Sequence, residues 1–309
     1  MLNEVHGYLK DVDEIFEPLR RRISKVDIDT LLPNDGDVKR IHFRFNAMIQ
    51  QTPVKLYVDL KLTRTSVRKR CSASVNNSES FVAPEGTRFV IDFDLRGDSV
   101  EDYSAQCYYT LSHEIIHVLE SYMRVAKNGW DERKHGMGWR GVKSHYYTCI
   151  ENMKVNPENK LFAFLYLTEK REIHAVVGEL RGALKLYNGN LSTSQDIAKA
   201  IKSTKAYNRL NTAIRIYNMY VNGIGLDGKP LSDSEVSKYR LQGILTWNYI
   251  MAPSNKGSRK RDENGDKGVF SDNQFRKKMK ARIDDFESLF WKQAYKIGYD
   301  VAQERIGVM

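Results

Sequence analysis

Residues 110–120 read TLSHEIIHVLE, and the pattern inside this stretch decides the expected fold. His113 and His117 are four residues apart, so on an α-helix they lie one turn apart on the same face. Two imidazoles in this arrangement can bind one zinc ion at about 2.0–2.1 Å. Glu114 lies beside the ion, where its carboxylate can take a proton from a zinc-bound water and return it to a leaving amine. The stretch therefore predicts a helix that carries a catalytic zinc site.

The context of this motif favours a zinc site over a chance arrangement. Only 7 of the 309 residues are histidine, so a chance HExxH is on the order of one in a hundred. Apolar residues recur at helical spacing around the motif, at Cys107, Leu111, Ile115, Leu119 and Tyr122. This stripe predicts a helix from about residue 100 to about residue 126.

The sequence before the motif alternates between apolar and polar residues in three places. These runs are 41–47, 54–62 and 89–95, and such alternation is typical of strands with one buried face. An amphipathic helix is predicted over residues 1–22. Strands followed by helices indicate the α+β class, with a small sheet and the HExxH helix in one domain.

The sequence after the motif becomes helical. Residues 128–141 are glycine-rich and predict a loop, whereas an apolar face predicts a helix over 169–187. Further helices are predicted near 194–204, 206–222, 233–251 and 272–305, with a polar loop over 253–270. We therefore expect two domains, residues 1–189 with the sheet and the motif, and an all-helical domain over 190–309.

The composition excludes several classes of protein. Hydrophobic residues make up 41% of the chain and charged residues 28%, which excludes a wholly disordered or collagen-like protein. Mean hydropathy is −0.54 and no apolar run is long enough to span a bilayer, so we expect no membrane partner. The first residues lack the pattern of a signal peptide, and three separated cysteines indicate free thiols in a reducing compartment.

Positive charge is concentrated in the second half of the chain. Residues 1–189 carry 28 basic and 26 acidic residues, whereas 190–309 carry 21 basic and 13 acidic residues. Within 256–282, ten basic and four acidic residues could attract the phosphates of nucleic acid without sequence preference. The segment lacks interleaved aromatic residues, so a solvated loop followed by the polar face of a helix explains it equally well.

A catalytic zinc site needs a third protein ligand, and Glu172 is the first candidate. It lies on the predicted helix 169–187, beside the apolar stripe, where its carboxylate points partly inward. HExxH followed by Tyr166, Glu172, Ile173 and Ala175 resembles the gluzincin metallopeptidases, and more closely small peptidase-like proteins encoded by bacteriophages. That resemblance covers roughly residues 85–187 and implies a zincin fold in which Glu172 completes a His-His-Glu set.

His135 is the second candidate for the third ligand. The HExxH motif followed by a loop and His135, Gly136 and Trp139 resembles the SprT-like proteases, some of which act on DNA-bound proteins. That family implies three histidines on zinc, and the basic second half would then guide the protease to DNA. If Glu172 is the ligand, His135 is most simply a solvated loop residue.

The combined expectation is a zinc-dependent metallopeptidase that hydrolyses peptide bonds through a zinc-activated water. His113, His117 and Glu172 would hold the zinc ion, and Glu114 would be the general base. Position alone does not choose the oxyanion donor among Tyr166, His145, Tyr146 and Tyr147. The alternatives are a SprT-like protease and a structural or virion protein that keeps a zinc site without turnover. We expect a cytoplasmic protein, or a virion-associated one if a phage encodes it, while substrate sequence and oligomeric state stay open.

Overall fold

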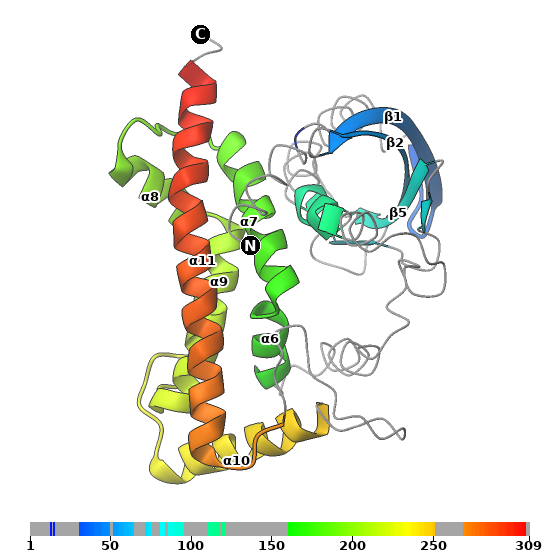
Figure 1. The fold of residues 1–309 in the computed structure, drawn as a ribbon. Helices are drawn as coiled ribbons and strands as arrows, with labels where there is room; N and C mark the ends of the chain where they lie inside the picture. The colour runs from blue at the N-terminus through cyan, green and yellow to red at the C-terminus, as the bar shows by residue number, and fades with distance from the viewer. Residues whose placement is uncertain are drawn as a thin grey trace. The chain divides into compact units, whose positions relative to one another are not determined.

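The computed structural model combines a β-sheet with helices, which confirms the α+β class (Figure 1). It describes residues 13, 15, 31–49, 52–64, 72–75, 81–83, 86–95, 110–117, 119–120, 160–250 and 268–306. Outside the described residues lie His135, His145, Tyr146, Tyr147, the predicted loop 128–141, residues 253–267 and most of the predicted helix 1–22.

The chain divides into two compact units that interleave along the sequence. The sheet unit comprises Met1–Trp139, His174–Ala200 and Ile297–Met309. The helical unit comprises Arg140–Ile173 and Ile201–Lys296. The expectation that residues 1–189 and 190–309 fold as two separate domains stays a prediction.

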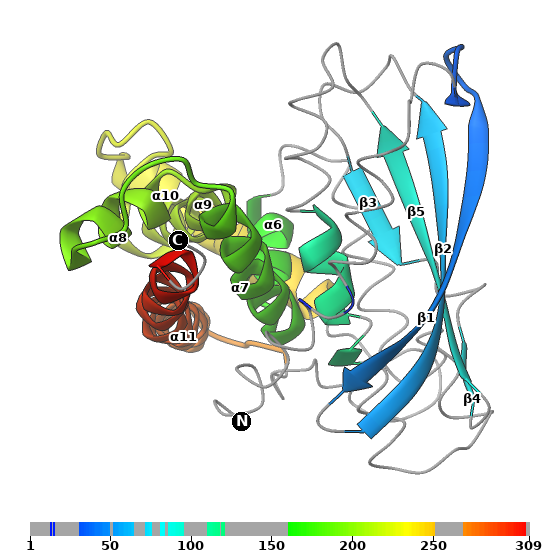
Figure 2. The ribbon, with the colours of Figure 1, turned by 90° about the horizontal axis from the view of Figure 1, so that it is seen from above.

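Five strands form one curved sheet (Figures 1 and 2). They are β1 (Val38–Ile49), β2 (Thr52–Arg64), β3 (Ser72–Val75), β4 (Phe81–Ala83) and β5 (Gly86–Leu95). The order is β1-β2-β5-β3, and β4 also pairs with β5. The β2–β5 pair is parallel and the other pairs are antiparallel. Strand β1 is therefore one edge of the sheet.

Hydrophobic alternation places one face of the sheet in the core. The buried side chains on that face are Phe43, Val58, Leu60, Leu62 and Ile91. The three predicted strands are confirmed as parts of β1, β2 and β5, each longer than the alternating run. The short strands β3 and β4 escaped prediction because four and three residues are too few to show a period.

The later helices follow the predicted pattern closely. They are α6 (Lys160–Leu167), α7 (Lys170–Lys185), α8 (Ser194–Lys202), α9 (Lys205–Tyr217), the π-helix η1 (Asn218–Asn222), α10 (Asp233–Ile250) and α11 (Asp272–Ile306). Every residue of the apolar stripe on α11 is buried: Phe275, Met279, Ile283, Phe286, Phe290, Ala294, Ile297 and Val301. In the described part of the chain, no helix is both long and apolar enough to cross a membrane.

Helix α6 was not predicted, and its sequence explains why. Residues 160–167 read KLFAFLYL, in which apolar side chains occur at every angle around the helix axis. Leu161, Phe162, Phe164 and Leu165 are buried, and the half-buried face carries apolar Ala163 and Leu167, so no polar face marks a 3.6-residue period.

Candidate metal centre

The HExxH motif lies on a helix whose described residues are 110–117 and 119–120. Leu111, Ile115 and Leu119 of the predicted stripe are buried, and so is Ile116. The polar residues of the motif are buried as well, with His113 at 4% exposure and Glu114 at 7%. Because burying polar groups without partners is costly, their placement in the interior calls for a specific chemical role or a network of contacts.

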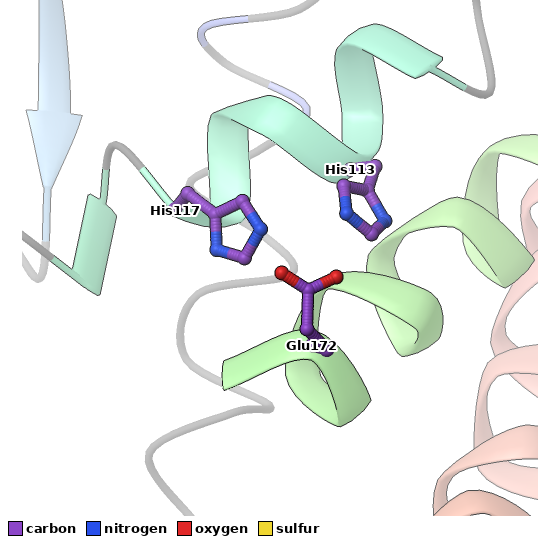
Figure 3. Close-up of side chains that lie close together, drawn as sticks. All are labelled: His113, His117 and Glu172. Carbon is purple, nitrogen blue, oxygen red and sulfur yellow. The ribbon is translucent and has the colours of Figure 1, made fainter. Parts of the chain in front are cut away.

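Figure 3 shows the His113 and His117 rings on one helix, with the carboxylate of Glu172 directed at both of them. One ligand atom from each of the three residues lies within 4.8 Å of the other two. The two ring centroids are 5.0 Å apart and the ring planes differ by 86°. A tetrahedral zinc ion with bonds of 2.0–2.1 Å places its ligand atoms about 3.4 Å apart, so a small closure of this group would fit one ion. Within the described residues, no other group of three His, Cys, Asp or Glu side chains comes as close.

Glu172 reaches the histidines from the first turn of α7. A carboxylate is favourable there because the helix dipole leaves partial positive charge at the N-terminus. The division between the two units falls inside α7, after Ile173, and the helix continues through it into the sheet unit. The buried side chains of Val176, Val177 and Leu180 fix the rotation of α7, and therefore the direction of Glu172.

Helix α7 packs antiparallel to the HExxH helix at very short range. His174 Nδ1 donates a hydrogen bond to Glu120 Oε1 at 2.5 Å, and His113 Nδ1 lies 3.6 Å from Glu179 Oε2. These two contacts show that the chain runs in opposite directions along the two helices. A Cβ atom on Gly178 would lie 3.1 Å from the backbone oxygen of Ser112, so the absence of a side chain there permits the approach.

Glu179 places a second carboxylate behind His113. Its side chain is 1% exposed, and its Oε2 lies 3.6 Å from Nδ1, slightly beyond hydrogen-bond distance. If the two atoms moved together, Nδ1 would donate to Glu179 and leave Nε2 for a metal ion, and such a carboxylate orients a ligating histidine and raises its basicity. Glu179 therefore belongs to the surroundings of the candidate centre, although it is not one of the three grouped residues.

Sequence reasoning predicted the three grouped residues but missed the residues that surround them. Glu120 lies three residues after His117, and Glu179 lies two helical turns after Glu172, so both spacings were visible in the sequence. What the sequence did not show is how the two helices are aligned, and this alignment decides which carboxylate meets which histidine. Tyr166 is half-buried on α6, and its role as an oxyanion donor stays a prediction.

Comparisons with protein-family models, with curated proteins and with solved structures find no match to this chain. The fold and the side-chain chemistry therefore define the class by themselves. This is an α+β protein with a candidate metal centre of two histidines and one glutamate on two packed helices.

Proposed function

We propose that this protein is a zinc-dependent metallopeptidase of the gluzincin type, with a zincin-like arrangement of its HExxH helix. The observation that supports the proposal is the grouping of His113, His117 and Glu172, which are contributed by two helices. The sequence separates His117 and Glu172 by 55 residues, so chance proximity of such chemically matched side chains is a poor explanation.

The donor set suits zinc. Two imidazole nitrogens and one carboxylate oxygen are the ligands of a familiar class of catalytic zinc site that keeps a fourth position open. His113, His117 and Glu172 would hold the ion. When bound, zinc supplies Lewis acidity, which polarises a peptide carbonyl and makes a water molecule more acidic.

Glu114 is the residue to which we assign the proton transfer. It follows His113 directly on the same helix and is 7% exposed, so it is a buried carboxylate next to a ligand residue in the sequence. From there it would accept a proton from the attacking water and donate it to the leaving amine.

The SprT-like alternative would replace Glu172 by His135 as the third ligand. His135 lies outside the described residues, so this alternative stays a prediction. The position of Glu172 beside both histidines supports the gluzincin-type set.

Metal content and peptide cleavage test the proposal together. We expect purified protein to contain about one zinc ion per chain and to cleave unfolded protein substrates. Glu114→Gln should keep the zinc and lose cleavage, because the amide has similar size but no basicity. Glu287→Gln, on α11, is the matched control and should cleave normally. Protein that binds zinc but cleaves nothing would support the structural alternative, and protein without any zinc affinity would reject both.

A further inference from the structure

Strands β1 and β2 form one end of the sheet, and the polar side chains of these two strands make a strongly basic face. Residues 38–64 contain six basic residues and one acidic residue. The strand register places the polar side chains of both strands on the same side: Arg40, His42, Arg44, Lys55, Tyr57, Asp59 and Lys61. We call this set the basic face. The opposite side carries the buried apolar residues of the sheet.

The basic face is open toward the free edge of the sheet. On the edge strand β1, the side chain of His42 is 61% exposed and Arg44 is exposed as well. On β2, Tyr57 and Lys61 are half-buried and Asp59 is 4% exposed. Val90 of β5, next to Asp59 in the register, is fully buried. A partner could therefore reach the cations from the β1 side.

The nearby acidic groups already have partners. Asp59 accepts a hydrogen bond from His42 Nδ1 at 2.7 Å, and Asp92 of β5 lies 3.8 Å from Lys61 Nζ. Within the part of the chain that the structure describes, Arg44 and Lys55 make no ion pair with a carboxylate. Positive charge is therefore in excess on this face.

Tyr57 holds these two cations close together. The guanidinium carbon of Arg44 lies 5.6 Å from the centre of the Tyr57 ring, and Lys55 Nζ lies 5.4 Å from it. The attraction of a cation to an aromatic ring is about 0.5–1 kcal/mol at an exposed site. The ring thus offsets part of the repulsion between two like charges and gives them defined positions.

Arg44 and Lys55 carry like charges at neighbouring positions of the same face, and like charges across a strand pair repel one another. In the register, Arg44 lies opposite Tyr57 and Lys55 lies opposite Asn46, so no carboxylate lies opposite either cation. A ligand that brings negative charge to this face would relieve their repulsion.

We propose that the basic face binds the phosphodiester backbone of nucleic acid without reading its sequence. Arg44 and Lys55 would neutralise phosphates, and the other basic residues of the face would add to the positive field. Nucleic acid carries one negative charge per nucleotide, so neighbouring phosphates of one strand can meet these two neighbouring cations. This inference is independent of the proposed peptidase activity.

A binding assay with charge-matched variants tests the proposal. Fluorescence anisotropy would measure the affinity of the full chain for a short labelled DNA duplex, and for one of its strands alone, over a range of salt concentrations. Arg44→Ala/Lys55→Ala should weaken binding by about tenfold or more at low salt and reduce the salt slope by about two units. The control, Lys292→Ala/Lys296→Ala, removes two exposed lysines from α11 and should change affinity by less than about twofold.

Variants of Tyr57 separate the positioning of the cations from their charge. Tyr57→Phe keeps the ring and should bind like wild type, whereas Tyr57→Leu keeps both charges and should weaken binding. Circular dichroism would verify that each variant is folded. The duplex and single-strand arms decide which form of the backbone is preferred.

Three results would overturn the proposal. The first is wild-type protein that binds neither DNA at low salt. The second is an equal loss of affinity in the Arg44/Lys55 and Lys292/Lys296 double variants, because net charge alone would then explain binding. The third is equally tight binding of polyglutamate, which would make this a general polyanion surface instead of a nucleic-acid surface.

Discussion

Glu172 is the residue on which the assignment of the candidate centre depends. Loss of a ligand that contacts the metal turns a three-ligand site into a two-ligand site, so Glu172→Ala should lower zinc affinity by several kcal/mol, on the order of the contribution of one ligand. His135→Ala should change the affinity little. Competition with a chromophoric chelator would measure both affinities.

This comparison needs a check on folding, because Glu172 is followed by the buried face of α7. Circular dichroism should show the same helix content in both variants. If His135→Ala lost the metal while Glu172→Ala kept it, the His-His-Glu assignment would be wrong and the SprT-like ligand set would replace it.

Tyr220 gives a residue-level prediction for the helical unit. Its side chain is 2% exposed, and burial raises the pKa of Tyr220 to about 12 from its usual value of 10.0, because the charged phenolate is poorly solvated inside the protein. The folded state then holds its proton more tightly than the unfolded state does. The stability associated with the neutral phenol is fully present below pH 10 and is lost as pH rises from about 10 to about 12.

Each pH unit in that window should cost up to about 1.4 kcal/mol of unfolding free energy. Urea unfolding of wild type and Tyr220→Phe at several alkaline pH values would isolate this contribution from that of other titrating groups. The variant should show the shallower decline. Parallel curves would mean that Tyr220 ionises as easily in the folded protein as in the unfolded chain.

At the scale of elements, the close packing of α7 on the HExxH helix sets the distance between the ligands. A Cβ atom on Gly178 would lie 2.6 Å from Cγ1 of Ile116 and 3.1 Å from the backbone oxygen of Ser112. Gly178→Ala should therefore push the two helices apart, lower stability by about 1–3 kcal/mol and weaken zinc binding. Thermal unfolding and metal competition would measure the two effects.

Gly243→Ala is a matched control in the helical unit. Its Cβ atom would lie 2.6 Å from Cζ of Phe275, a clash of the same size in a place without candidate ligands. This variant should lose stability but keep its zinc affinity. Equal zinc affinities in the two variants would show that helix spacing does not control the centre.

The elements also show what the sequence could and could not predict. Helix α11 was predictable because a buried stripe repeats along 35 residues, whereas α6 was not, because its apolar residues occur on every side of the helix. Strands β1, β2 and β5 were predictable from alternation, but the alternation did not reveal that β2 and β5 pair in parallel. To predict the hydrogen bond between His174 and Glu120, one must know how the two helices align, and no local sequence pattern contains that information.

At the scale of the whole molecule, the ligand set connects distant parts of the sequence. His117 and Glu172 are 55 residues apart, and each lies on an element with its own buried face. An unfolded chain does not hold these side chains together, so a bound ion would stabilise the folded state over the unfolded one. The thermal stability of the whole chain should therefore report on the candidate centre.

The expected gain follows from mass action. With free zinc at about one hundred times the dissociation constant, binding adds about 2.7 kcal/mol to the unfolding free energy, and each kcal/mol corresponds to about 1.5 °C in Tm for a chain of 309 residues. Chelator should lower the Tm of wild type by several degrees, and added zinc should restore it. Glu172→Ala should show neither change, because it no longer holds the ion firmly, whereas Glu114→Gln should respond like wild type because the proton-transfer residue is not a ligand. An unchanged wild-type Tm in chelator and in zinc would mean that the three side chains meet without binding a metal, and the proposed peptidase activity would lose its basis.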